Sequence, residues 1–138
     1  MTIIHSRHGD LTPEQVADAL PGTGEVMRAV GHCHAMAWHA ARGGNWDLAA
    51  YFLRRVRSLL RGLAVTRPKY AAHIADFDRD QLERAYQALI SRDISAFQAA
   101  YDTTVERANE YHVETGHPYI RWSPPAEPPD AGLDLSQT

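Results

Sequence analysis

A histidine at the end of a long amphipathic stretch is the residue best placed to do chemistry in this chain. Phe97, Tyr101, Thr104, Ala108 and His112 recur at steps of three and four residues, which places them on one face of a predicted helix. We therefore expect His112 to point towards whatever this face buries. Because an imidazole can exchange a proton near neutral pH, the position indicates acid/base chemistry.

The residues after His112 predict that the chain turns back on itself. Gly116 is typical of the residue that ends a helix, and Pro118 prevents its continuation. The segment 117–122, HPYIRW, should therefore lie close to His112. Arg121 in this segment is a candidate contact for an anionic ligand, with a surface ion pair as its ordinary alternative.

A second group of histidines lies in residues 31–41, GHCHAMAWHAA. On a helical wheel His32 and His39 lie near Met36, whereas His34 lies on the other flank. His32 and His39 are two helical turns apart, roughly 10 Å, which is too far for both to hold one metal ion. We therefore predict no metal site in this segment. A metal would need ligands from two helices, for example one of these histidines with His112 and a carboxylate.

The functional prediction is a pocket without a cofactor, in which histidines transfer protons to and from a small metabolite. Such chemistry is typical of lyases and isomerases. The candidate catalytic residues are His112, His34, His39 and Tyr101. The candidate ligand-binding residues are His32, Met36, Trp38, Tyr111 and Arg121. Each of these side chains also has an ordinary alternative, as a hydrogen-bonded histidine or a packed core residue. The sequence contains no motif of a hydrolase, kinase or dehydrogenase.

The elements that must position these residues are predicted to be helices. Thr12 and Pro13 have the features of a cap and first residue of a short helix, TPEQVADAL. A longer helix should run from about Glu25 to Arg42 and end at the two glycines that follow. Asn45 is placed to cap the next helix, which carries a wide apolar face.

The second half of the chain predicts two more helical regions. One opens near Pro68 and reaches Ile90, with residues 76–80, DFDRD, either interrupting it or forming its solvated side. The last helix should be capped by Asp93. No strand-like alternation occurs before Tyr119. Short connections between four main helices predict an all-α protein, an antiparallel four-helix bundle with a short N-terminal helix.

The predicted bundle domain covers residues 1–122, and a proline-rich tail covers residues 123–138. The prolines prevent a helix there, so the tail should either pack in an extended form or be disordered. With 44% hydrophobic residues, 22% charged residues and a net charge of -3, the composition gives no reason to expect binding to nucleic acid or to a membrane. No apolar run approaches the roughly 20 residues that span a bilayer.

Cys33 is the only cysteine and cannot form an internal disulfide, and the N-terminus lacks the pattern of a signal peptide. We therefore expect a cytoplasmic protein. A homodimer is left open, because one apolar stripe can serve a core or an interface.

Two segments together are similar to a known group of proteins. GNWDLAAYFLRRV at 44–56, followed by AFQAAYDTTVERANEYHVETGHPYI at 96–120, resembles bacterial four-helix proteins related to cytochrome c′. In that group the last helix carries a Cys-x-x-Cys-His haem attachment site. Here Ala108 and Tyr111 stand at the two cysteine positions and His112 is retained.

The resemblance implies a haem-protein scaffold whose former cofactor cavity holds side chains, a noncovalent cofactor or a substrate. One alternative is therefore a protein that binds haem noncovalently, with His112 as axial ligand and Met36 or another histidine opposite, or a metal ion through His112. The second alternative is a non-catalytic interaction protein. That alternative predicts a cavity filled by side chains.

Overall fold

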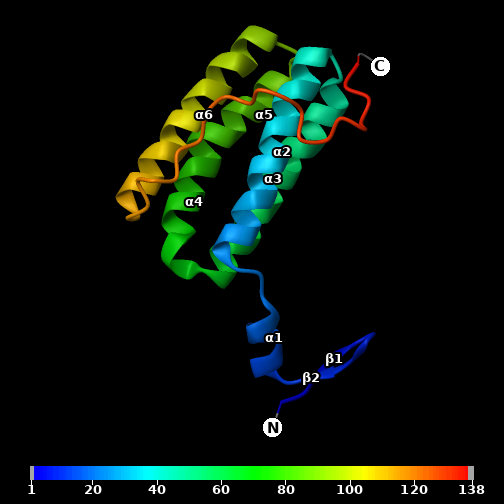
Figure 1. Cartoon of the computed structure of the whole chain (residues 1–138), viewed down its shortest axis with the longest axis vertical. Coiled ribbons are helices and arrows are strands. Elements are labelled where there is room, and N and C mark those ends of the chain that lie inside the picture. Colours follow the sequence, from blue (N-terminus) through cyan, green and yellow to red (C-terminus); the bar gives the residue numbers. More distant parts are fainter. Residues whose placement is uncertain (1, 137–138) are drawn as a thin grey trace.

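The computed structural model describes residues 2–136, and most of these residues are helical, as the sequence predicts. A helical body spans α2 to α6, an N-terminal arm (residues 2–20) projects from it, and a C-terminal strap (residues 117–136) crosses it (Figure 1). Residue 1 of the predicted domain and residues 137–138 of the predicted tail lie outside the described residues. No helix within residues 2–136 combines the length and apolarity that crossing a bilayer requires.

Two long helices, α2 (Thr23–Gly43) and α3 (Trp46–Thr66), pack along each other. The connection between them is short because Gly44 adopts φ 92°, a left-handed conformation that glycine tolerates without strain. The side chain of Asn45 then caps α3 by accepting a hydrogen bond from the N–H of Leu48 at 3.2 Å. The sequence predicts both features of this turn, the end of α2 at the two glycines and the cap of α3 at Asn45.

The second half of the body begins with a short 3₁₀ turn, η1 (Pro68–Tyr70). It continues as α4 (Ala71–Phe77), a π-helical segment η2 (Asp78–Leu82) and α5 (Glu83–Ile90). Residues 76–80, DFDRD, therefore do not interrupt the helical run. From Asp78 onward, however, the backbone is π-helical and not α-helical. The last helix, α6 (Ile94–Glu114), starts where the Asp93 carboxylate accepts from the N–H of Ala96 at 3.0 Å.

An ion pair fastens α3 to the π-helical segment. The Arg57 guanidinium donates to both carboxylate oxygens of Asp78, each at 2.8 Å, and to Glu83 Oε2 at 2.7 Å. Arg57 is mostly buried, with 18% of its side chain exposed. The pKa of Asp78 is lowered chiefly by the hydrogen bonds from Arg57. The pair places the Arg57 side chain between α3 and the segment from Asp78 to Glu83.

The core is built mainly from one stripe of each long helix. Met36, Leu53 and Phe97 are fully buried, from α2, α3 and α6 respectively. Alanines at positions 37, 40 and 49 are equally buried and allow α2 and α3 to approach closely. The core is therefore tightest near the α2–α3 turn.

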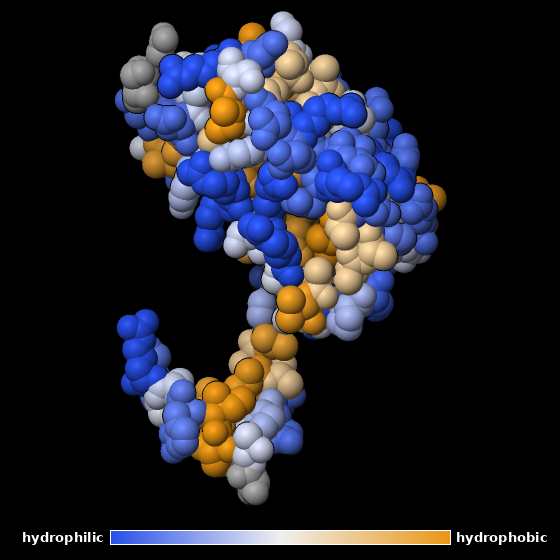
Figure 2. Space-filling view, turned by 180° about the vertical axis from the view of Figure 1, so that it is seen from behind, coloured by the Kyte–Doolittle hydropathy of each residue, from blue (hydrophilic) through white to orange (hydrophobic). Residues whose placement is uncertain are grey.

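The N-terminal arm contains a β-hairpin, which the sequence pattern does not predict. Its strands β1 (Ile4–Ser6) and β2 (Gly9–Leu11) pair antiparallel, with Ile4 opposite Leu11. Three residues per strand are too few to give a recognisable alternation, which is why the pattern was missed. Helix α1 (Pro13–Ala19) follows with the predicted Thr12 cap. It buries no residue, and Figure 2 shows hydrophobic side chains exposed along the arm.

The strap is attached to the body at both ends. Near its start the backbone N–H of Trp122 donates to Asn109 Oδ1 at 2.7 Å, and Asn109 Nδ2 donates to the Trp122 carbonyl at 3.0 Å. At its far end Asn45 Nδ2 donates to the Asp134 carbonyl at 3.0 Å. Residues 123–136 of the tail therefore run in an extended form across the helices (Figure 1).

Candidate functional site

A cavity of about 1110 Å³ lies between the helices and the strap. Residues of α2, α3, α4 and α6 form its walls, and strap residues from Trp122 to Pro129 border it on one side. Five of the eight histidines of the chain line this one cavity: His32, His34, His73, His112 and His117. Its volume slightly exceeds the usual range of small-molecule sites, so a ligand of substantial size would fit.

The strap side of the cavity depends on a close contact between Gly31 and Trp122. The indole ring lies directly over Gly31 on α2, and a Cβ atom there would overlap the ring. A side chain at position 31 would therefore push the strap away from the helices. The two hydrogen bonds between the Asn109 side chain and the Trp122 backbone hold Trp122 in the same place from α6.

His34 lies on α2 and packs face to face against Tyr101 of α6. The two ring centroids are 4.1 Å apart and the ring planes differ by 10°. The Nε2 atom of His34 is buried and has no hydrogen-bond partner among the described residues. Burial lowers the pKa of His34 to about 4, so the imidazole is neutral at neutral pH. Part of the residue stays accessible because it borders the cavity.

His112 lies in the last turn of α6, where the helix ends and the chain reverses. Its carbonyl accepts a hydrogen bond from the N–H of His117 at 2.7 Å, which closes the turn. Its Nδ1 atom is buried without a partner in the described part of the chain. Burial lowers the pKa of His112, and this effect outweighs the nearby Ile120 carbonyl, which raises it. His112 is therefore also neutral at neutral pH.

Tyr101 contributes a hydroxyl that stays protonated. The residue is only 3% exposed, and burial raises its pKa above the ordinary value for tyrosine. A protonated phenol can donate a hydrogen bond to a ligand oxygen. Its neighbour Thr104 cannot do so freely, because Thr104 Oγ1 already donates to the Ala100 carbonyl at 2.7 Å.

The structure brings together five of the predicted site residues at the cavity: His112, His34, Tyr101, His32 and Tyr111. Tyr111 packs under the Arg107 guanidinium, which lies 3.9 Å from the ring centroid. The other four predicted residues do not border the cavity: His39, Met36, Trp38 and Arg121. Three of them lie on α2, where only one face of the helix borders the cavity, and Arg121 lies on the strap.

The four residues outside the cavity have identifiable positions. Met36 is fully buried in the core, and Arg121 is exposed on the strap. Trp38 and His39 pack edge to face, with ring centroids 4.8 Å apart, and the Arg42 guanidinium lies over Trp38. Trp38 Nε1 and His39 Nε2 are buried without a partner in residues 2–136, but neither residue borders the cavity.

The cavity residues that were not among the predicted site residues include His73, His117 and Trp122. His73 lies three residues after Tyr70 and four before Phe77, so its spacing placed it on the same face of the helix as both. For Trp122 no local signal exists, because its position depends on how the strap crosses α2.

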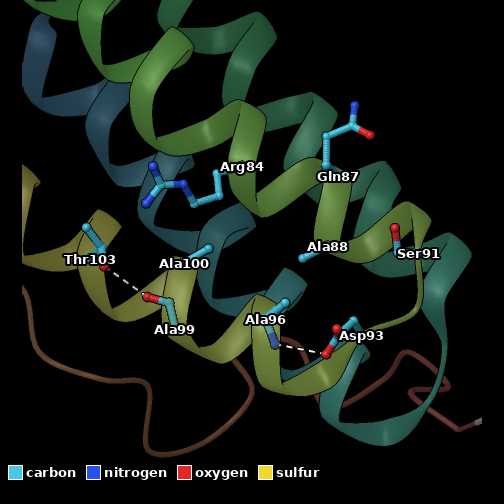
Figure 3. Close-up of a pocket in the computed structure, with 9 residues that line it drawn as sticks. All are labelled: Arg84, Gln87, Ala88, Ser91, Asp93, Ala96, Ala99, Ala100 and Thr103. Atoms are coloured by element: carbon cyan, nitrogen blue, oxygen red, sulfur yellow. Dashed lines mark hydrogen bonds between the residues drawn. The ribbon is translucent and has the colours of Figure 1, made fainter.

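Across residues 2–136, no three histidine, cysteine or acidic side chains come close enough together to hold a metal ion. A smaller pocket of about 470 Å³ lies between α5 and α6 (Figure 3). Two of its polar groups are already used locally, since the Asp93 carboxylate caps the N–H of Ala96 and Thr103 Oγ1 donates to the Ala99 carbonyl. We therefore consider the histidine-lined cavity the better candidate site.

Comparison with known protein families, with curated proteins and with solved structures finds no match to this chain. The function is therefore argued from the cavity itself.

Proposed function

We propose that this protein binds a small molecule in the histidine-lined cavity and catalyses proton transfer on it, as a cofactor-free enzyme of the lyase or isomerase type. The observation that carries the proposal is that His34 and His112, on different helices, border one large cavity, and each has a buried ring nitrogen without a partner. An unpartnered buried nitrogen costs about 1–3 kcal/mol. A ligand that supplies the missing hydrogen bond recovers part of this free energy.

The three polar side chains would have different roles. His112 is the proposed general base, because a neutral imidazole has a lone pair to accept a proton. His34 is the weaker base, since its pKa of about 4 leaves little affinity for a proton. It would instead orient the ligand by hydrogen bonding, together with the protonated hydroxyl of Tyr101.

The proposal includes an architecture and a location. The body would be an antiparallel four-helix bundle, counting α2, α3, the run from α4 to α5, and α6 as its four helices. The short turn at Gly44 and Asn45 and the turn before Asp93 support this arrangement. We also propose a cytoplasmic location, because the single cysteine is buried and free.

The test is a screen of metabolites by thermal shift, followed by an assay of turnover for each compound that stabilises the protein. His112→Ala should abolish turnover while the far-UV circular dichroism of the helices is unchanged. His8→Ala is the matched control, because His8 is exposed on the arm. Activity retained by His112→Ala would exclude the proposed base, and the lack of any stabilising compound would count against the binding site itself.

Noncovalent haem is the second candidate, favoured by the presence of His112 at a cavity of this size. The side chains fit only in part. His112 and His34 border the cavity, whereas Met36, the predicted opposite ligand, is fully buried in the core. Haem would supply redox or ligand-binding chemistry at its iron. Titration with haem, followed by its absorption near 400 nm in wild type and His112→Ala, separates this candidate from the first.

A further inference from the structure

The charges around the cavity restrict what it can hold. Among the described residues that border it, only Arg28 and Glu127 carry a fixed charge, and both are exposed to solvent. Their charges are opposite, so they give the cavity no net attraction for an ion. An ion placed against the apolar side chains of the wall would lose its hydration without finding a partner of opposite charge.

The inner wall of the cavity is apolar. Val30, Val56, Leu60, Leu63, Ile74 and Leu82 contribute to it from α2, α3, α4 and η2. The buried histidines behave consistently with this wall, because burial lowers the pKa of both His34 and His112. The same loss of hydration that keeps these rings uncharged would disfavour a charged group on a ligand.

The cavity is also lined by hydrogen-bonding side chains, among them those of His73, Tyr101 and Tyr111. Two further lining histidines, His34 and His112, each have one buried ring nitrogen, Nε2 and Nδ1 respectively, that lacks a partner in residues 2–136. Neutral imidazole can donate or accept one hydrogen bond at each nitrogen, depending on its tautomer. A hydroxyl or carbonyl group matches such partners without bringing a charge into the cavity.

We infer that the ligand is an uncharged, largely apolar organic molecule whose main polar group is a hydroxyl or carbonyl, bound next to His34 and His112. The inference rests on the proposed function, because it names the class of molecule for that same cavity. It distinguishes this site from one that selects carboxylates, phosphates or organic cations.

Three probes with one ring system test the inference: 1-pyrenemethanol, 1-pyrenecarboxylate and 1-pyrenemethylammonium. Their binding to the full chain is measured by pyrene fluorescence at pH 7.5, where the first is neutral, the second anionic and the third cationic. We expect the alcohol to bind at least about tenfold more tightly than either ion, because only the ions must lose their hydration.

The variant Ala108→Trp, which places a large side chain in the cavity from α6, should weaken binding of the alcohol by about tenfold or more. Ala99→Trp is the matched control, because Ala99 is exposed on the same helix and does not border the cavity. Ala35→Leu is a milder filling variant from α2, used if Ala108→Trp loses its helical circular dichroism.

The outcomes separate the two proposals. Equal or tighter binding of either ion overturns the inference about the ligand class and leaves the binding site standing. Binding of the alcohol that Ala108→Trp and Ala35→Leu leave unchanged places the probe elsewhere, and overturns the inference as well. If none of the three probes binds, the inference about the ligand class is overturned, whereas the proposed binding function is decided by the metabolite screen.

Discussion

The imidazole of His34 stacks on the phenol ring of Tyr101, with the ring centroids 4.1 Å apart, and thereby joins α2 to α6 at the wall of the cavity. The contact buries a titratable group in an apolar setting, where its neutral form is favoured. The pair therefore links the stability of the fold to the protonation of a proposed site residue.

We predict that His34 makes stability depend on pH. Its pKa is about 4 in the folded chain against 6.5 as the ordinary value, so the unfolded chain binds the proton more tightly. Stability should therefore fall as pH decreases from about 6.5 towards 4, by on the order of 3 kcal/mol, and then level off. Urea unfolding at a series of pH values measures this loss.

His34→Phe keeps an aromatic ring against Tyr101 but cannot be protonated. The variant should lose the share of the pH dependence between pH 4 and 6.5 that comes from His34, while His39 and His112, whose pKa values burial also lowers, keep their contributions. A slope in this range that is identical in wild type and His34→Phe would show that His34 is not the responsible group.

We predict that the ion pair of Arg57 with Asp78 stabilises the junction between α3 and the π-helical segment. Arg57→Ala leaves Asp78 without its guanidinium partner and should cost about 1–3 kcal/mol of unfolding free energy. Arg54→Ala on the same helix is the control, since Arg54 is exposed and has no ion pair in residues 2–136.

The Arg57–Asp78 pair also makes stability depend on pH. Here the cause is a carboxylate that loses its charge in acid, whereas His34 gains one. Because the folded pKa of Asp78 is lowered below 3.8, its contribution is fully present above that value and is lost as pH falls further. Denaturation by acid below about pH 4 should therefore be less steep in Arg57→Ala. Equal acid sensitivity in wild type and variant would argue against this account.

We predict that Gly31 controls the position of the strap. In Gly31→Val the new side chain overlaps the Trp122 ring, so the indole should move away from α2 into water. In a background where Trp38 and Trp46 are phenylalanine, the emission of Trp122 should shift to longer wavelength. The cost in stability should be about 1–3 kcal/mol, as for other overpacked sites.

Gly62→Ala is the control for adding a side chain at a glycine position within a helix. Gly62 is exposed on α3 with open space around its Cβ position, so alanine there should be neutral or stabilise the helix by up to about 1 kcal/mol. An emission spectrum of Gly31→Val that matches the parent would mean that the strap tolerates a side chain at this position.

The helices were predictable because their signals are local. Thr12, Asn45 and Asp93 cap the helices that follow them, and Gly44 ends α2, as the residue types indicate. The hairpin at Ile4–Leu11 and the π-helical segment at Asp78–Leu82 were not predictable from pattern. Three-residue strands give no periodicity, and the π-helical turn is held partly by a salt bridge to Arg57 from a distant helix.

For the candidate site, the sequence alone determined which residues share a helical face, since the spacing of Tyr101, Thr104 and His112 follows from the pitch of the helix. Only the tertiary structure decided which faces meet. It placed His34 against Tyr101, brought Trp122 over Gly31, and left His39 and Arg121 outside the cavity. Periodicity orders side chains around one helix, whereas a cavity is defined by several helices and a strap that pack together from distant parts of the chain.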